Sequence, residues 1–203
     1  MDHLINLGDL ISCDTKEQMD LLWKKVNILF DKRMHHIFGN HDLDHLTLDE
    51  LKTLSGQEEK QVFFTPGFRH IIVSAYRNTT GIDVAPDTLS WLTSQLNNKG
   101  ERVIVYMHYP ISEDPDNLSY YHKNHPERAF VRQAAQLRQL LSTSNCSAFI
   151  NGHTHFPFDK KINGLRHITV PSFAEDDKGV PMAAAGILEL TNATIKYHLL
   201  SFR

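Results

Sequence analysis

Two histidines, His153 and His155, flank a single threonine in the stretch FINGHTHFPF, residues 149–158. Imidazole nitrogens are frequent metal ligands and proton carriers. The pair alone decides little, because a lone His-x-His on a loop is more often a solvated turn than a ligand site. The meaning of the pair therefore depends on which other residues accompany it.

Further polar residues follow other apolar runs in the same way. Asp9 follows LINLG, Asn40 follows HIFG and His108 follows VIVYM, while His41 comes directly after Asn40. Each run is typical of a buried strand, and residues just past the carboxyl ends of adjacent strands meet in one crevice in layered α/β folds. We therefore expect one Asp, one Asn and three His to reach one place.

These donors are oxygens and imidazoles, with no thiolate among them. Such a set suits a borderline divalent ion such as Mn²⁺, Fe²⁺ or Zn²⁺ and argues against a structural cysteine zinc site. Cys13 and Cys146 lie far apart and belong to no paired motif, so a disulfide framework is not expected and a reducing compartment is favoured.

Each of these residues also has a simpler interpretation. After a glycine, Asp9 could end a strand and Asn40 could be a left-handed turn residue. His108, between apolar residues, would more often be a hydrogen-bonded core histidine. For any one residue the simpler interpretation is favoured, but the ordered set favours a shared site because several accidents would have to coincide.

The apolar patterns predict the elements that position this set. Helical spacing is expected over three segments, at residues 15–33, 85–98 and 126–144. Strands are expected at residues 3–7, 34–38, 62–65, 70–76, 102–107 and 146–150, followed by a β-rich tail from residue 167. Strands alternating with helices indicate a mixed α/β domain with sheets covered by helices.

Composition limits the class of protein. The 203 residues, 41% hydrophobic and 22% charged, predict a single domain over residues 1–203. A net charge of -3 gives no long-range attraction to a nucleic acid polymer or an anionic membrane. No apolar run approaches the roughly 20 residues of a membrane span, and no secretory leader pattern opens the chain, so a cytoplasmic location is expected.

Four motifs occur in order: GDLI at 8–11, GNHD at 39–42, MHYP at 107–110 and GHTH at 152–155. From residue 3 to about residue 172 the chain resembles the calcineurin-like metallophosphoesterases, and most of all their class III cyclic nucleotide phosphodiesterase branch. The resemblance implies a β-sandwich of two mixed sheets flanked by helices. It also implies hydrolysis of a small phosphodiester or phosphomonoester substrate, with a cyclic nucleotide as one candidate.

The resemblance assigns a role to each motif residue. Asp9 would bridge two metal ions. The second ion would take the amide oxygen of Asn40 and the imidazoles of His108 and His153, while the first would take His155. His41 would not be a ligand but would face the leaving oxygen as general acid or electrostatic partner. Two such ions clamp the phosphoryl oxygens and activate a water for in-line attack.

Three further side chains have weaker assignments. His122 and His125, in YYHKNHPER, could line the substrate mouth, although the sequence favours a surface loop. Tyr109 stands where many relatives carry a second histidine, so a contact with substrate or with the metal ligands is a further hypothesis.

The chain also departs from the family pattern. Relatives carry an Asp-x-His motif on a strand before the Gly-Asp motif, whereas here Asp2 and His3 are adjacent and about 20 Å of extended chain from Asp9. We therefore expect an N-terminally incomplete domain that lacks this first strand. It is either a shortened version of a longer gene product or a natural variant with a single-metal or inactive site, and one ion in place of two is the expectation for its metal content. Reduced activity and self-association through exposed strand edges are expected to follow.

Two competing interpretations remain at this point. A non-catalytic metal-binding or interaction protein would use the same fold without turnover. A protein phosphatase is disfavoured, because the Asp-Arg-Gly and Glu expected after the Gly-Asp and Gly-Asn-His positions are replaced by GDLISCD and GNHDLD.

Overall fold

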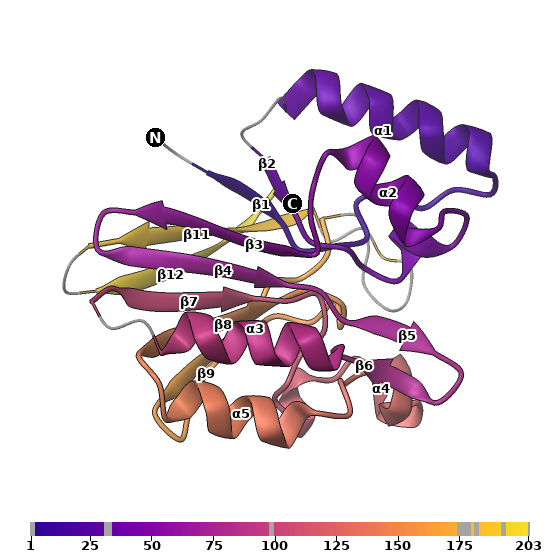
Figure 1. Ribbon diagram of the computed structural model, residues 1–203. Helices are drawn as coiled ribbons and strands as arrows, with labels where there is room; N and C mark the ends of the chain where they lie inside the picture. Colours follow the sequence, from indigo (N-terminus) through magenta and orange to yellow (C-terminus); the bar gives the residue numbers. More distant parts are fainter. Residues whose placement is uncertain are drawn as a thin grey trace.

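The computed structural model describes residues 3–30, 34–97, 100–173, 180, 183–191 and 194–202. Its centre is a six-stranded sheet in the order β3-β4-β7-β8-β10-β9 (Figure 1). The inner strands run parallel, whereas the outer strands β3 and β9 pair antiparallel with their neighbours. The strands of this sheet are β3 (Lys60–Thr65), β4 (Phe68–Val73), β7 (Arg102–Tyr106), β8 (Cys146–Asn151), β9 (Phe158–Ile162) and β10 (Leu165–Thr169).

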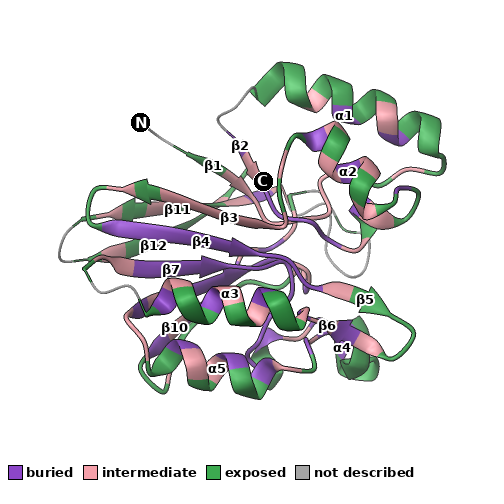
Figure 2. Cartoon of the chain, in the orientation of Figure 1, coloured by how far each residue is buried: buried purple, intermediate pink, exposed green. Residues whose placement is uncertain are grey.

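Helices α3 (Pro86–Leu96) and α5 (Ala134–Ser142) cover one face of the sheet (Figure 1). Proline in the first turn of α3 suits a helix start, where its missing N–H needs no partner. Leu92 and Leu137 are fully buried with the sheet residues of one core cluster. Every residue of β4 is buried, and β7 is buried from its second residue to its last (Figure 2).

The opposite face of the sheet packs against a second β layer. This layer holds the parallel pair β1 (Leu4–Asn6) and β2 (Met34–His36), and the antiparallel hairpin β11 (Ala184–Leu190) and β12 (Ile195–Ser201). Apolar residues of both layers form one cluster, which includes Ile72, Tyr106, Ile150, Leu7 and Leu188. The predicted mixed α/β class is confirmed, and the described strands of the second layer form two separate two-stranded sheets.

Helices α1 (Lys16–Phe30) and α2 (Leu48–Ser55) pack beside β2 around Met19, Trp23 and Leu51, which are fully buried. The sequence analysis did not predict α2. Its signal is visible, because Thr47 and Glu50 form a reciprocal capping box and Gly56 ends the helix in a left-handed conformation.

The helix expected over residues 126–144 is wrong in its first half, since α5 begins only at Ala134. Before it lies the single turn η4 (Pro126–Arg128), and the backbone then pairs with the small sheet of β5 (Tyr76–Asn78) and β6 (Gly81–Asp83). Val131 bridges Ile82, and the Arg132 N–H donates to the Ile82 carbonyl at 2.9 Å. Pairing with β6 therefore replaces helical hydrogen bonds there.

Short elements complete the chain: η2 (His41–Leu43), η3 (Pro115–Asn117) and α4 (Tyr120–Asn124). Among the described residues, no helix combines the length and apolar character that a membrane crossing requires.

Candidate metal centre

Asp9, His108 and His153 bring one ligand atom each within 4.8 Å of one another. They follow β1, β7 and β8, so the expected convergence of strand ends is observed. His108 Nε2 lies at the centre, 3.2 Å from Asp9 Oδ2, 3.1 Å from His153 Nδ1 and 3.3 Å from Asn40 Oδ1. Four side chains from four separate loops thus point at one place.

Backbone carbonyls fix the orientation of both imidazoles. His108 Nδ1 lies 2.7 Å from the Leu7 carbonyl, and His153 Nε2 lies 2.7 Å from the Arg128 carbonyl. A carbonyl only accepts, so these two ring nitrogens carry the protons. The other nitrogen of each ring is then an acceptor aimed at the centre. Metal-binding histidines are commonly oriented in this way, by a hydrogen bond from the ring nitrogen that does not bind the metal.

Four acceptor atoms facing one another repel unless a cation or a proton lies between them. The three other acceptors lie 3.1 to 3.3 Å from His108 Nε2. Neighbouring ligand atoms that each lie about 2.1 Å from a divalent ion are about 3 Å apart, so these separations match those around a bound ion. The residues therefore fit a metal ion of the Mn²⁺, Fe²⁺ or Zn²⁺ type, with three neutral donors and one anionic donor.

The members of the cluster shift one another's pKa values. Burial raises the pKa of Asp9, but the nearby His108 charge and its hydrogen bond outweigh burial and hold that pKa below its ordinary value. Burial lowers the pKa of His108, yet the Asp9 carboxylate outweighs burial and raises it. For His153, burial and the neighbouring His108 and His122 all lower the pKa. The Asp9 carboxylate thus favours the protonated form of His108, while the surroundings of His153 favour its neutral form, which can coordinate a metal ion.

Three of the predicted ligands have strained backbones. Asp9, His153 and His155 have φ angles of 56°, 68° and 56°, in the left-handed region that non-glycine residues rarely adopt. Such residues cost free energy and persist where surrounding structure holds them, most often at functional sites. Asn40, in contrast, has a right-handed backbone conformation. The simpler interpretation of Asn40, as a left-handed turn residue, is therefore wrong.

Two motif glycines are required by close approach. A Cβ atom on Gly39 would lie 2.2 Å from Asp9 Oδ1 and 2.6 Å from the Asp9 backbone nitrogen. A Cβ atom on Gly8, whose φ is +100°, would lie 2.3 Å from His108 Nδ1. The glycines therefore let the loops after β1 and β2 touch each other and the His108 ring.

Asp42 joins these two loops from behind, a role that the sequence analysis missed. Its fully buried side chain accepts hydrogen bonds at Oδ2 from the backbone N–H groups of Asp9, at 2.8 Å, and Gly39, at 2.9 Å. His36 Nε2 lies 3.1 Å from the same oxygen. The last letter of GNHD was the available signal, but only the tertiary contacts show what Asp42 does.

His41 lies beside the acceptor cluster without joining it. Its backbone N–H donates to Asp9 Oδ1 at 2.7 Å, and its half-exposed ring places Nδ1 2.7 Å from Asp44 Oδ2. A carboxylate accepts, so Nδ1 carries a proton and the pair orients the ring. His155 is half-buried on the loop of His153, and the three-residue ligand group of the described chain does not include it.

Tyr109 is buried, and its ring centroid lies 4.8 Å from that of His108 and 4.6 Å from that of His153. It therefore packs against both imidazoles, as the hypothesis of a contact with the ligands requires. The sequence favoured a surface loop for His122, and this prediction is wrong. His122 is buried, and its ring centroid lies 4.7 Å from that of His153.

His3 lies away from this centre, with Nδ1 3.1 Å from His35 Nε2 and its ring stacked on Phe63. The three-residue ligand group found among the described residues does not include His3. Asp2 lies outside the described residues.

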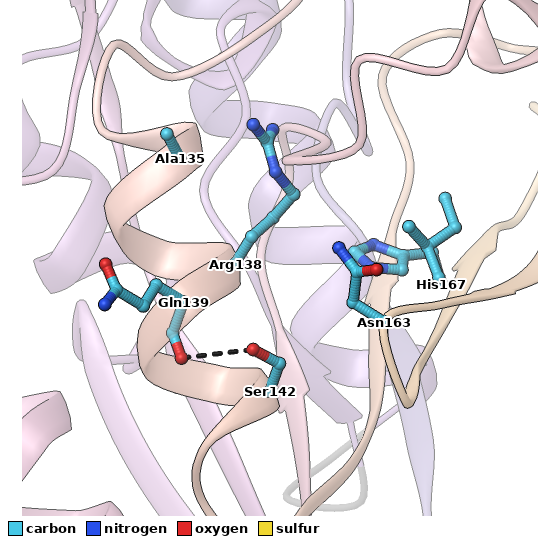
Figure 3. Close-up of a pocket in the computed structure, with 7 residues that line it drawn as sticks. Ala135, Arg138, Gln139, Ser142, Asn163 and His167 are labelled. Carbon is cyan, nitrogen blue, oxygen red and sulfur yellow. Dashed lines mark hydrogen bonds between the residues drawn. The ribbon is translucent and has the colours of Figure 1, made fainter.

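A separate cavity of about 280 Å³ lies between α5 and the β9–β10 hairpin (Figure 3). Arg138 and His167 line it, together with Asn163 at the hairpin turn, and no predicted site residue does. Burial, followed by the nearby charge of Arg138, lowers the pKa of His167 to about 4. His167 therefore contributes no positive charge to the cavity at neutral pH. The residues that line the cavity do not include those of the acceptor cluster.

Comparison with known proteins agrees with this geometry. The model of the calcineurin-like phosphoesterase family matches residues 2–157. Among solved structures, a dimetal phosphatase from Danio rerio has a TM-score of 0.65 at 18% identity, with 83% of this chain and 71% of that chain covered. A phosphopantetheinyl hydrolase from Mycobacterium tuberculosis has a TM-score of 0.57 at 14% identity, with 84% and 79% covered. Identities this low show a shared fold. No curated protein sequence matches the chain significantly.

Proposed function

The chain belongs to the calcineurin-like phosphoesterase family, and on that premise we propose that it is a divalent-metal-dependent phosphoesterase. One observation carries the proposal: His108 Nε2, Asp9 Oδ2, Asn40 Oδ1 and His153 Nδ1 converge as acceptors with ligand-like separations. His108 is buried and the other three residues are partly buried. Acceptors that converge in such a place cost free energy unless a cation or a proton lies between them.

In this proposal Asp9, Asn40, His108 and His153 hold one divalent ion. When bound, the ion supplies positive charge to the phosphoryl oxygens and makes a water nucleophile more acidic. The family resemblance supports a second, weaker ion at Asp9 and His155. It also supports a phosphodiester such as a cyclic nucleotide as the substrate, with turnover reduced if the second ion is absent.

The remaining polar groups act on protons and orientation. Leu7 and Arg128 hold His108 and His153 in the tautomers that leave one acceptor nitrogen on each ring. Asp44 accepts the Nδ1 proton of His41 and orients the ring, so that the imidazolium form of His41 would give its Nε2 proton to the leaving oxygen. His41 can reach this position because its backbone is fixed on Asp9.

The direct test is hydrolysis of bis(p-nitrophenyl) phosphate by protein stripped with a chelator and reloaded with Mn²⁺. We expect turnover to return when the metal is restored. In Asn40→Ala we expect turnover to fall by about 100-fold, because the variant loses one of the four metal ligands. Bound Mn²⁺ is measured in parallel. Metal-independent turnover, or full turnover in Asn40→Ala, would contradict the proposal.

His41→Ala separates proton transfer from metal binding. We expect kcat to fall by about 100-fold, within the range of general acid catalysis, while Mn²⁺ affinity stays within about twofold. The variant keeps the backbone N–H that donates to Asp9, so the ligand should stay in place. Equal losses of kcat and of bound metal would show that His41 is a ligand or supports one.

The competing function, a non-catalytic metal-binding or interaction protein, predicts Mn²⁺ binding that depends on Asn40 without any turnover. The same pair of measurements therefore decides between the two. The cytoplasmic location and the pairing of strand edges between copies stay predictions.

A further inference from the structure

The segment from Ser119 to Arg128, which contains α4 and η4, lies directly against the candidate metal centre. The Arg128 carbonyl accepts from His153 at 2.7 Å, and the buried His122 ring contacts the His153 ring. Ser119 fixes His122, since its Oγ lies 2.8 Å from His122 Nδ1 and accepts from the His122 backbone N–H. The segment therefore contacts a predicted metal ligand near both of its ends.

From His122 a series of aromatic rings leads outward to solvent. The His122 ring lies 4.7 Å from that of His153, the Tyr121 ring 5.2 Å from that of His122, and the His125 ring 4.7 Å from that of Tyr121, between centroids. Exposure rises along the series, from 7% for His122 to 39% for Tyr121. An exposed tyrosine thus lies two ring contacts away from a metal ligand.

The same segment carries a net charge of +1, from Lys123 and Arg128 against Glu127, although the whole chain carries a net charge of -3. Glu127 Oε1 lies 3.8 Å from Arg128 Nε. Arg128 donates from Nη1 to the Tyr121 hydroxyl, and its side chain is 44% exposed. Lys123 lies in the last turn of α4, and Glu127 is the one acidic residue between Tyr120 and Arg128. Aromatic rings beside a guanidinium offer stacking and cation–π contacts to a planar ligand, and positive charge attracts a phosphoester.

We propose that Tyr121, supported by His125 and Arg128, is a specificity-determining element that stacks against a planar aromatic group of the phosphoester while the phosphoryl group lies at Asp9 and His108. The His122 ring lies between the rings of Tyr121 and His153, so a spacer would separate the aromatic group of the ligand from its phosphorus. This inference rests on the proposed function, which supplies the position of the phosphoryl group.

The test compares two probes that differ only in the planar group, AMP and ribose 5-phosphate, bound to the Mn²⁺-loaded protein. Dissociation constants are measured by calorimetry in the cold, and phosphorus NMR confirms that each ligand is intact. We expect the protein to bind AMP about tenfold more tightly, as one base–aromatic stack provides. Tyr121→Ala should reduce this ratio to about one and leave the Kd of ribose 5-phosphate within twofold.

Two matched variants separate stacking from a structural effect. Tyr121→Phe keeps the ring and should keep most of the ratio, whereas Tyr120→Ala makes the same truncation at the neighbouring, 71% exposed tyrosine and should leave the ratio unchanged. A ratio near one in the unmodified protein, an unchanged ratio in Tyr121→Ala, or an equal loss in Tyr120→Ala would overturn the inference.

Failure of the proposed function has a different signature. In that case the unmodified protein neither hydrolyses bis(p-nitrophenyl) phosphate with Mn²⁺ nor binds ribose 5-phosphate, and both proposals fall. Turnover together with binding of both probes at equal affinity would overturn the role of Tyr121 alone.

Discussion

Asp9→Asn should lower Mn²⁺ affinity by about a thousandfold and reduce phosphoesterase turnover below detection, without unfolding the protein. Asp9 is the one anionic donor among the four converging acceptors, and its attraction for a divalent ion is of the order of 4 kcal/mol or more at this range. Metal content after dialysis and a calorimetric Mn²⁺ titration measure the loss.

Asparagine is the informative replacement because it preserves the surroundings of the side chain. It tolerates the left-handed backbone of residue 9, where φ is 56°, and its amide oxygen can still accept from the His41 N–H. Its NH₂ group can donate to His108 Nε2, so the hydrogen-bonding groups of the metal-free cluster have partners without a cation.

Asp116→Asn, at an exposed carboxylate, is the matched control and should keep full metal affinity. Unaltered Mn²⁺ binding by Asp9→Asn would show that the ion binds elsewhere.

The convergence of site residues could be predicted because it depends on strand ends. Asp9, Asn40 and His108 each follow a short apolar run, and the parallel pairing of β1 with β2 and of β7 with β8 brings those ends to one side. The apolar runs were sufficient to predict this convergence, because buried parallel strands have a recognisable sequence pattern and their carboxyl ends lie at the same edge of the sheet.

The supporting contacts could not be predicted, because they depend on the way distant segments pack. The contact of His122 with His153 joins residues 31 positions apart and requires α4 to fold back over the site. The amphipathic pattern that suggested a helix over residues 126–144 continues through Val131, but that residue pairs with Ile82 in β6. Tertiary pairing overrides helical propensity at such places.

A fully buried carboxylate, that of Asp42, helps to hold together the two loops that carry Asp9 and Asn40, so its removal should have a large effect on stability. In Asp42→Ala the backbone N–H groups of Asp9 and Gly39 lose their acceptor, and His36 loses its partner. Each unsatisfied buried donor costs about 1–3 kcal/mol, so the free energy of unfolding should fall by about 3–5 kcal/mol. Urea unfolding of the metal-free protein measures this change.

Asp42→Asn distinguishes the geometry of the clamp from its charge. Its amide oxygen can replace Oδ2 as acceptor for the two backbone N–H groups, so the expected loss is smaller, about 1–2 kcal/mol. Asp116→Ala, at an exposed site, should change the free energy of unfolding by no more than about 0.5 kcal/mol.

Because Asp42 fixes the backbone of Asp9, Mn²⁺ affinity should also decrease in both Asp42 variants, and more in the alanine variant than in the asparagine variant. If Asp42→Ala were as stable as the unmodified protein, the two loops would have to be held by other contacts, and the close approach at Gly39 would be their main constraint.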